Sequence, residues 1–169
     1  MARLTDITSY ADAHAHFSAE KLWELFDGDR EHLNIAHECI DRHAGRSNPA
    51  VIVVKADGSS ETLSFRDIAE DSSQFAHWLV GEGVKPGDRV AIMLEPSRAF
   101  YAAVFGTMKV GAIAVPLFTL FGPDGVKLRV DDCKPRLLVT NAEKAPLLAL
   151  AGARGVISYA VFFAELQLF

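Results

Sequence analysis

The chain has 169 residues, half of them hydrophobic, and a net charge of −5 at pH 7. This composition can build a packed core, so disorder is not the default expectation, and no basic block points to nucleic acid. The longest apolar run, 110–120, is about half of the ~20 residues that a membrane span needs, and Pro116 interrupts it. Two cysteines, Cys39 and Cys133, give no disulfide framework and suit a reducing compartment, so we expect a cytoplasmic protein.

Residues 1–30 are predicted to form an N-terminal extension. The segment is polar and mixed, with one apolar cluster that could dock on a larger body, made of Leu22, Trp23, Leu25 and Phe26. After it, apolar residues recur with helical spacing over 33–43, at positions 33, 36 and 40, which predicts a helix.

The segment 51–56 is a β-branched run and predicts a strand. Asp57-Gly58 then turns the chain into a second short strand at 61–63, which indicates a hairpin. Ser64 is predicted to cap the next helix, with Asp67 in the position of a capping box.

The rest of the chain alternates apolar strands with helices. The capped helix runs from 65 to about 79, and the next helix is apolar nearly all round, so we expect it to be buried between layers. Strands are predicted at 88–94, 112–118 and 136–140, and helices at 96–110, 122–134 and 145–151. This order predicts an α/β fold, a doubly wound and mostly parallel sheet with helices on both faces.

The segment 156–169 is apolar and has nothing after it to cover it. We expect it to pack back on the core or to mediate self-association. The predicted organisation is therefore an extension at 1–30, a partial α/β subdomain at 31–155 and an apolar tail at 156–169.

Glycine and serine patterns give no phosphate site. Gly81, Gly83 and Gly87 follow a helix and precede a strand, whereas a dinucleotide fingerprint follows a strand and opens a helix. The turn with the correct context holds Glu95, which repels anions, and Ser97, which is better explained as a helix cap. Neither GxxxxGK[ST] nor GxSxG occurs.

Titratable pairs likewise predict no metal site and no catalytic dyad. Zinc needs three or four ligands, and neighbouring helix positions point apart. Solvated or core-edge side chains are the better explanation for His14 with His16, Cys39 with His43, His37 with Asp41, and Asp131 with Asp132.

Several motifs in order resemble the AMP-forming acyl-CoA synthetases of the adenylate-forming superfamily. LSFRDI at 63–68 resembles the family's L-[TS]-[YF]-x-[DE]-L, and MKVGAIAVPLF at 108–118 resembles its LKAGAxxVPL segment. VKPGDRVAIML at 84–94 is similar to the GVxxGDRVAI run between them, and NIAHECIDRHA at 34–44 resembles an upstream helix of acetyl-CoA synthetase-like members. The resemblance covers about 30–145 and implies the first, incomplete part of the family's N-terminal domain.

The resemblance implies that an intact relative activates a carboxylic acid with ATP and Mg²⁺ to acyl-AMP, then transfers the acyl group to CoA. The motifs that perform these steps normally lie downstream of the matched stretch, so it implies no catalytic and no metal-binding residue here. One loop is implied to border the CoA entry, at Thr119, Leu120 and Phe121, where relatives often carry small residues.

Two hypotheses follow. In the first, the chain is the N-terminal piece of an AMP-forming acid–CoA ligase and is inactive alone. In the second, it is a non-catalytic assembly or binding module, completed by a partner chain through its apolar tail. A free-standing nucleotide-binding domain has less support, because no phosphate loop is present.

Overall fold

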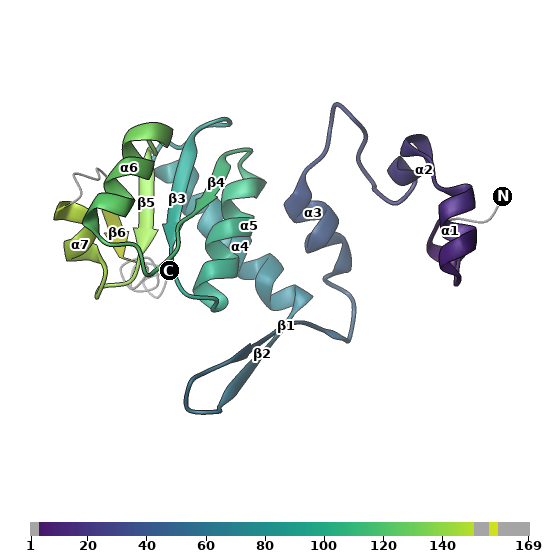
Figure 1. Cartoon of the computed structure of the whole chain (residues 1–169), viewed down its shortest axis with the longest axis horizontal. Coiled ribbons are helices and arrows are strands. Elements are labelled where there is room, and N and C mark those ends of the chain that lie inside the picture. The colour runs from purple at the N-terminus through teal and green to yellow at the C-terminus, as the bar shows by residue number, and fades with distance from the viewer. Residues whose placement is uncertain (1–3, 151–155, 159–169) are drawn as a thin grey trace.

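The computed structural model describes residues 4–150 and 156–158 (Figure 1). Within these residues the body of the protein is a four-stranded parallel sheet in the order β4-β3-β5-β6. Its strands are β3 (Arg89–Met93), β4 (Ile113–Pro116), β5 (Leu137–Thr140) and β6 (Val156–Ser158). Helices lie on both faces, which confirms the predicted doubly wound α/β fold.

Alternate residues of the central strand face two different helical layers. Val90 and Ile92 of β3 pack with Phe75 and Leu79 of α4 (Phe65–Gly81), beside α5 (Arg98–Lys109). On the opposite face, Met93 joins a second core with residues of α6 (Pro123–Cys133) and α7 (Ala145–Leu150). A strand that is buried on both faces needs a continuous apolar sequence. This explains the apolar run at 88–94 from which β3 was predicted.

The start of α4 and the burial of α5 match their predictions. Ser64 and Asp67 form a complete capping box: the Asp67 amide donates to Ser64 Oγ at 3.1 Å, and the Ser64 amide donates to Asp67 Oδ2 at 2.8 Å. None of the residues of α5 is fully exposed, because the helix lies against α4, α3 (Ile35–Cys39) and the sheet.

The predicted hairpin forms a separate antiparallel sheet of β1 (Pro49–Val54) and β2 (Ser60–Ser64). The predicted helix over 33–43 is wrong in its extent. It ends at Cys39, because Ile40 leaves helical dihedral angles, and η2 (Asp41–His43) follows as a 3₁₀ turn. Of the three predicted apolar positions, Ala36 and Ile40 are buried and Leu33 is exposed.

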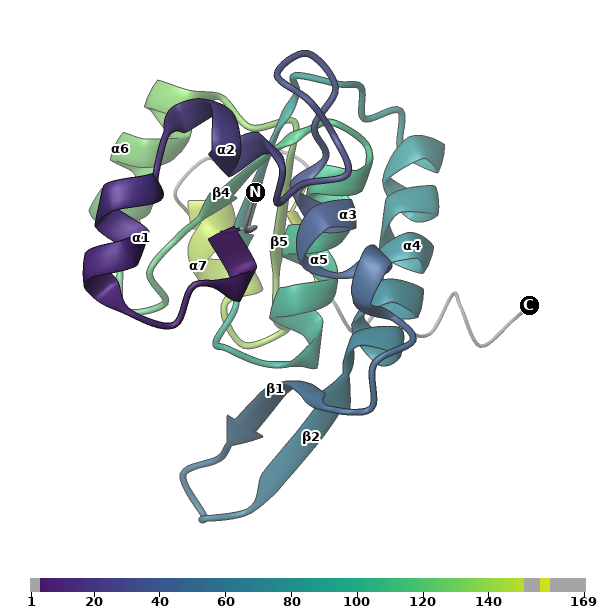
Figure 2. The ribbon, with the colours of Figure 1, turned by 90° about the vertical axis from the view of Figure 1, so that its right-hand side faces the viewer.

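The N-terminal elements η1 (Leu4–Asp6), α1 (Tyr10–His16) and α2 (Ala19–Trp23) stand away from the sheet, beyond α3 (Figure 1). Figure 2 views the molecule from the side of these elements, so α1 and α2 lie in front of the body. We call residues 4–33 the N-terminal arm. At the other end, the first three residues of the predicted apolar tail form β6, and 159–169 lie outside the described residues.

Candidate functional site

The carboxyl edge of the parallel sheet is the place where this fold forms ligand sites. After β3 the chain passes through α5 to β4 on one side, then returns through α6 to β5 on the other side of β3. Open α/β sheets bind ligands where the strand order reverses in this way, outside the carboxyl ends of the strands. The loops after β3, β4 and β5 therefore define the candidate site.

The loops after β3 and β4 are joined by hydrogen bonds. The Leu117 amide donates to the Ile92 carbonyl at 2.8 Å. Beyond it, the Thr119 hydroxyl donates a short hydrogen bond to the carboxylate of Glu95. Thr119 is buried whereas Glu95 is exposed, so this bond holds one end of the loop against the sheet edge.

The three residues predicted to border a CoA entry differ in orientation. Thr119 is turned inward, whereas Leu120 is 76% exposed. Phe121 closes a turn through its amide to the Phe118 carbonyl at 3.1 Å, and the two rings meet edge to face at 5.6 Å. The Arg129 guanidinium covers the Phe121 ring at 3.7 Å. The loop thus presents an apolar tip on a fixed base, and its contact with a ligand stays a prediction.

The third loop is also fixed to the sheet. The buried Thr140 hydroxyl donates to the Met93 carbonyl at 3.0 Å, which ties the end of β5 to the end of β3. Asn141 follows, and its side-chain oxygen accepts the Lys144 amide at 2.9 Å at the start of α7. The edge is therefore ordered and polar, with hydroxyl and amide groups engaged within the protein.

The turn before α5 does not fit a phosphate group. Ser97 is a helix cap, as predicted: its Oγ accepts the Phe100 amide at 3.3 Å and donates to the Glu95 carbonyl at 2.9 Å. The Glu95 carboxylate lies beside this helix start and would repel an anion. The glycines after α4 end that helix instead, since Gly83 has φ +73° and its amide bonds the Val80 carbonyl at 3.0 Å.

Two of the titratable pairs considered in the sequence have members with different surroundings in the structure. His37 contacts Asp27 at 3.0 Å, while Asp41 pairs with Lys109 at 2.7 Å. Cys39 is exposed. The ring of His43 packs against Phe65, and its burial, together with nearby arginines, lowers the pKa of His43. Across residues 4–150 and 156–158, no group of three His, Cys, Asp or Glu side chains could hold a metal ion.

His14 and His16 lie on the exposed helix α1, where the ring of His16 bonds the Asp12 carbonyl at 2.8 Å. Asp131 pairs with Lys127 at 2.7 Å along α6, as expected for solvated surface charge. The positions of both pairs on helices therefore need no metal-binding or catalytic role to explain them.

One charged cluster was missed by the sequence reasoning. The Glu38 carboxylate is almost fully buried and accepts the amides of Asp27 and Gly28 at 2.8–3.1 Å as well as Arg42. Burial raises the pKa of Glu38, but these hydrogen bonds and the Arg42 charge outweigh it and lower the pKa. The sequence offered one signal for this cluster, an Arg four residues after a Glu. It offered no signal for the amides, which lie ten and eleven residues from Glu38.

No helix in the described part of the chain is long and apolar enough to cross a membrane.

Comparison with known proteins identifies relatives for most of the chain. Residues 40–165 match the family model described as AMP-binding enzyme. The acetyl-coenzyme A synthetase of Bacillus subtilis is 33% identical over 142 residues, which cover 82% of this chain and 25% of that protein. The acetyl-coenzyme A synthetase of Bradyrhizobium diazoefficiens is 34% identical over 140 residues, covering 73% and 21%.

Solved structures agree with these relatives. The crystal structure of an acyl-CoA synthetase from Brucella canis matches 94% of this chain with a TM-score of 0.83 and 28% identity, over 32% of that chain. Fatty acyl-adenylate ligases from E. coli and L. pneumophila match 78% with a TM-score of 0.69 and 27% identity, over 26% of the solved chain. The present chain therefore spans a quarter or less of these two curated relatives, and about a third or less of the solved ones.

Proposed function

The chain belongs to the family of AMP-binding enzymes, and on that basis we propose that it forms the N-terminal part of an AMP-forming acid–CoA ligase. The observation that carries the proposal is the match over 40–165, a stretch that includes the parallel sheet and its carboxyl edge. In this organisation, 1–30 is an extension, 31–155 the partial α/β subdomain and 156–169 an apolar tail.

The proposed role of the chain is to build one wall of the ligase. The loop at Thr119, Leu120 and Phe121 borders the entry of CoA, with the exposed Leu120 side chain available to an apolar part of that cofactor. The bond from Thr119 to Glu95 positions the loop and leaves the Thr119 hydroxyl engaged.

ATP, Mg²⁺, CoA and a carboxylic acid are the reactants proposed for the intact ligase. The turn from β3 to α5 does not fit a triphosphate, since it holds Glu95 and no glycine. We therefore assign no reaction step to this chain and propose that the catalytic groups come from the rest of the ligase. The free cysteines suit the reducing cytoplasm that we propose as its compartment.

ATP–pyrophosphate exchange tests this proposal. The 169-residue chain, supplied with Mg·ATP, labelled pyrophosphate and acids from acetate to decanoate, should give no exchange above a protein-free blank. The intact acetyl-coenzyme A synthetase of Bacillus subtilis provides the positive control with acetate. Exchange catalysed by the purified 169-residue chain alone would show that it holds a complete adenylation site.

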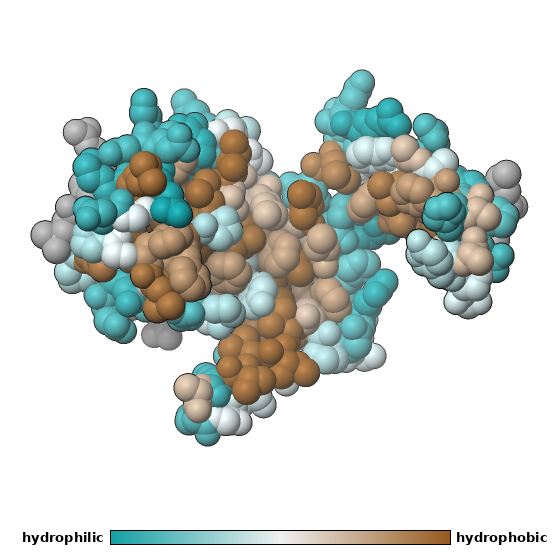
Figure 3. Space-filling model, viewed as in Figure 1, coloured by the Kyte–Doolittle hydropathy of each residue, from teal (hydrophilic) through white to brown (hydrophobic). Residues whose placement is uncertain are grey.

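The β1–β2 hairpin favours a second candidate, a non-catalytic assembly module. Val51 and Val53 face the core, whereas Ile52 and Val54 on the opposite face are 58% and 70% exposed. Figure 3 shows hydrophobic surface over the hairpin. An uncovered apolar face of this kind marks an interaction surface.

Size-exclusion chromatography with light scattering separates the two candidates. Self-association that the double variant Ile52→Thr, Val54→Thr abolishes would favour the assembly module. A monomer that binds no apolar dye counts against it.

A further inference from the structure

The dipeptide Asp-Gly occurs three times in the chain, at 27–28, 57–58 and 124–125. In this dipeptide the glycine amide nitrogen can attack the side-chain carboxyl carbon of the aspartate, because glycine has no side chain to hinder the approach. The N–Cγ bond forms, and the amide proton leaves with the carboxyl hydroxyl as water, which gives a cyclic succinimide. Water then opens the ring. Opening at the main-chain carbonyl leaves the chain linked through the side chain, as an isoaspartyl residue.

The Asp57-Gly58 pair lies in the turn that joins β1 to β2. Figures 1 and 2 show the hairpin extending away from the body, with this turn at its far end. Every residue from 54 to 60 is exposed. Gly58 has φ +82°, and a Cβ atom at this position would have no neighbour within 4 Å. Ring closure here moves no packed group and breaks one backbone hydrogen bond, from the Gly58 amide to the Lys55 carbonyl at 3.0 Å.

The Asp57 carboxyl group is held in a way that favours attack on its carbon. Its Oδ1 accepts both the amide of Ser59 at 2.9 Å and the Ser59 hydroxyl at 2.6 Å. Attack at Cγ places negative charge on this oxygen, and two donors already aimed at it stabilise that charge as in an oxyanion hole. The same bonds lower the pKa of Asp57, so the acid form that loses water is scarce at neutral pH and the reaction is slow.

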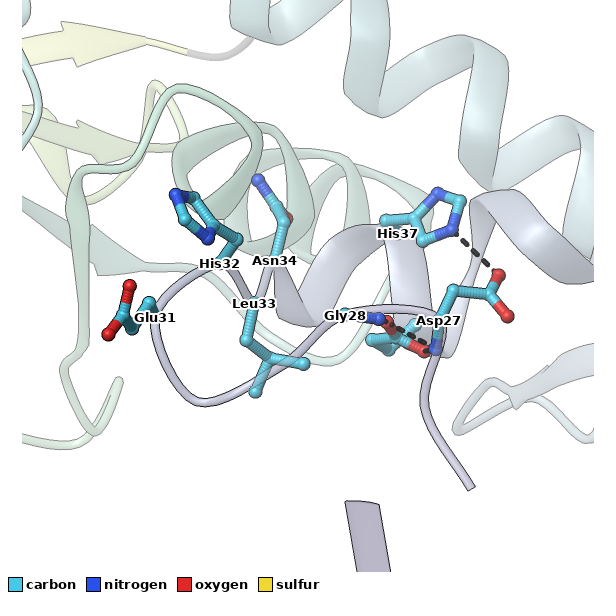
Figure 4. A pocket seen from close by; sticks show the side chains of 8 residues that line it. Asp27, Gly28, Glu31, His32, Leu33, Asn34 and His37 are labelled. Carbon is cyan, nitrogen blue, oxygen red and sulfur yellow. Dashed lines mark hydrogen bonds and ion pairs between the residues drawn. The ribbon is translucent and has the colours of Figure 1, made fainter. Parts of the chain in front are cut away.

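The Asp27-Gly28 pair, in the N-terminal arm, has both reacting groups engaged. The Gly28 amide donates to the buried carboxylate of Glu38 at 2.8 Å. The Asp27 carboxylate contacts His37 at 3.0 Å and Arg42 at 2.9 Å (Figure 4). Ring closure would take an amide away from a buried carboxylate, which is costly, so we expect this pair to stay intact.

The Asp124-Gly125 pair is held by helical geometry at the start of α6. The Val126 amide donates to the Gly122 carbonyl at 3.0 Å, and the Gly125 carbonyl accepts Arg129 at 2.8 Å. Ring closure needs the backbone of Asp124 to rotate out of the helical conformation, which would break this first turn. We therefore expect this pair to react slowly as well.

We propose that Asp57 is a site of spontaneous isomerisation to isoaspartate, because its Asp-Gly pair is the one of the three that the fold leaves free to react. The product has one more atom in the main chain of the hairpin turn. It therefore changes the geometry between the Lys55 amide and the Ser59 carbonyl, which now bond at 2.8 Å. The old main-chain carbonyl becomes an exposed carboxylate, the group that an isoaspartyl methyltransferase esterifies.

Mass spectrometry of the aged chain tests this inference. The 169-residue chain is kept for several weeks in heavy-oxygen water at neutral pH and physiological temperature, then digested in ordinary water. Each ring that has opened leaves one heavy oxygen atom in its peptide, and fragmentation distinguishes isoaspartate from aspartate. We expect the label at Asp57 to exceed that at Asp27 and Asp124 at least about tenfold, because local opening is easiest in an exposed turn. Three short synthetic peptides, each containing one of the pairs, should react at similar rates.

Two variants test the structural reasoning. Glu38→Ala frees the Gly28 amide and should raise the label at Asp27 several-fold, while the label at Asp57 stays unchanged. Asp57→Glu should return methylation of the aged chain by an isoaspartyl methyltransferase to the level of the fresh chain, since the longer side chain closes the ring far more slowly.

Label concentrated at Asp57 in the folded chain, with comparable rates in the three peptides, supports the inference. Equal label at the three pairs overturns it, because the fold would then protect none of them. A labelled peptide with an unlabelled Asp57 in the folded chain also overturns it, since the bonds of Lys55 and Ser59 would then lock the turn. These outcomes do not depend on the proposed ligase function.

Discussion

Replacing Gly106 with alanine should destabilise the chain, although alanine is the better helix former. Gly106 lies within α5 where that helix meets α4. A Cβ atom at this position would lie 2.7 Å from the Ser72 carbonyl oxygen and 2.9–3.0 Å from two atoms of Phe75. A backbone carbonyl cannot rotate away as the end of a side chain can, so the two helices would have to separate.

Two opposing terms set the magnitude. Alanine in place of glycine within a helix gains about 1 kcal/mol. Inserting a methyl group into a packed contact costs about 1–3 kcal/mol, and the backbone contact places this site at the upper end. We expect a net loss of about 1–2 kcal/mol, which corresponds to a Tm lower by roughly 2–8 °C for a chain of this length.

Urea unfolding followed by Trp78 fluorescence measures this change, because Trp78 packs on Phe75 with ring centres 5.4 Å apart. A Trp23→Phe background removes the signal of the only other tryptophan. Gly81→Ala is the matched control: it ends α4 with open space around it and should gain up to about 1 kcal/mol. If Gly106→Ala raises the urea midpoint as Gly81→Ala does, the steric reasoning is wrong.

Three further predictions concern polar contacts. Asp71→Asn weakens the pair of hydrogen bonds from Arg98 at 2.6 and 3.0 Å. Because Arg98 is 42% exposed, we expect the free energy of unfolding in urea to fall by only about 1 kcal/mol, and this loss to be smaller in 1 M NaCl. Glu38 has a pKa below its usual 4.5, so its stabilising effect is present above that pH and is lost as the pH falls through the lower folded pKa. The gap in urea midpoint between the parent and Glu38→Gln should therefore be wide at pH 7 and narrow in acid, and a constant gap would contradict this. Thr119→Val removes the bond to Glu95 and should speed amide exchange in that loop several-fold. The free energy of unfolding from urea titration should fall by no more than about 1 kcal/mol.

The sheet was predictable because its signals are local. A strand covered on both faces must be apolar throughout, as 88–94 is, and a helix start such as Ser64 with Asp67 needs partners only three residues apart. The strand order, with β5 beside β3 and away from β4, is set by how the helices pack and has no local signature.

Long-range polar contacts explain what the sequence did not reveal. Glu38 is a charged residue on a short helix, and its burial depends on amides of the loop at Asp27 and Gly28. The helix over 33–43 was predicted too long because Ile40 fits the apolar spacing and is indeed buried, yet its backbone leaves the helix. In the candidate site, the strand that leads into the loop was predictable from the motif, whereas the Thr119–Glu95 bond joins residues 24 apart.

The motifs that identify the family have structural roles in this chain. LSFRDI contains the capping box that starts α4, and MKVGAIAVPLF contains Gly111, whose amide closes α5 onto the Met108 carbonyl at 3.0 Å. A match to these motifs therefore reports that the sheet is built as in the relatives, and it carries no information on a reacting group. Membership of the family and catalytic activity are separate inferences for this chain. The first follows from residues that pack and cap, and the second depends on groups that the remainder of a ligase would have to supply.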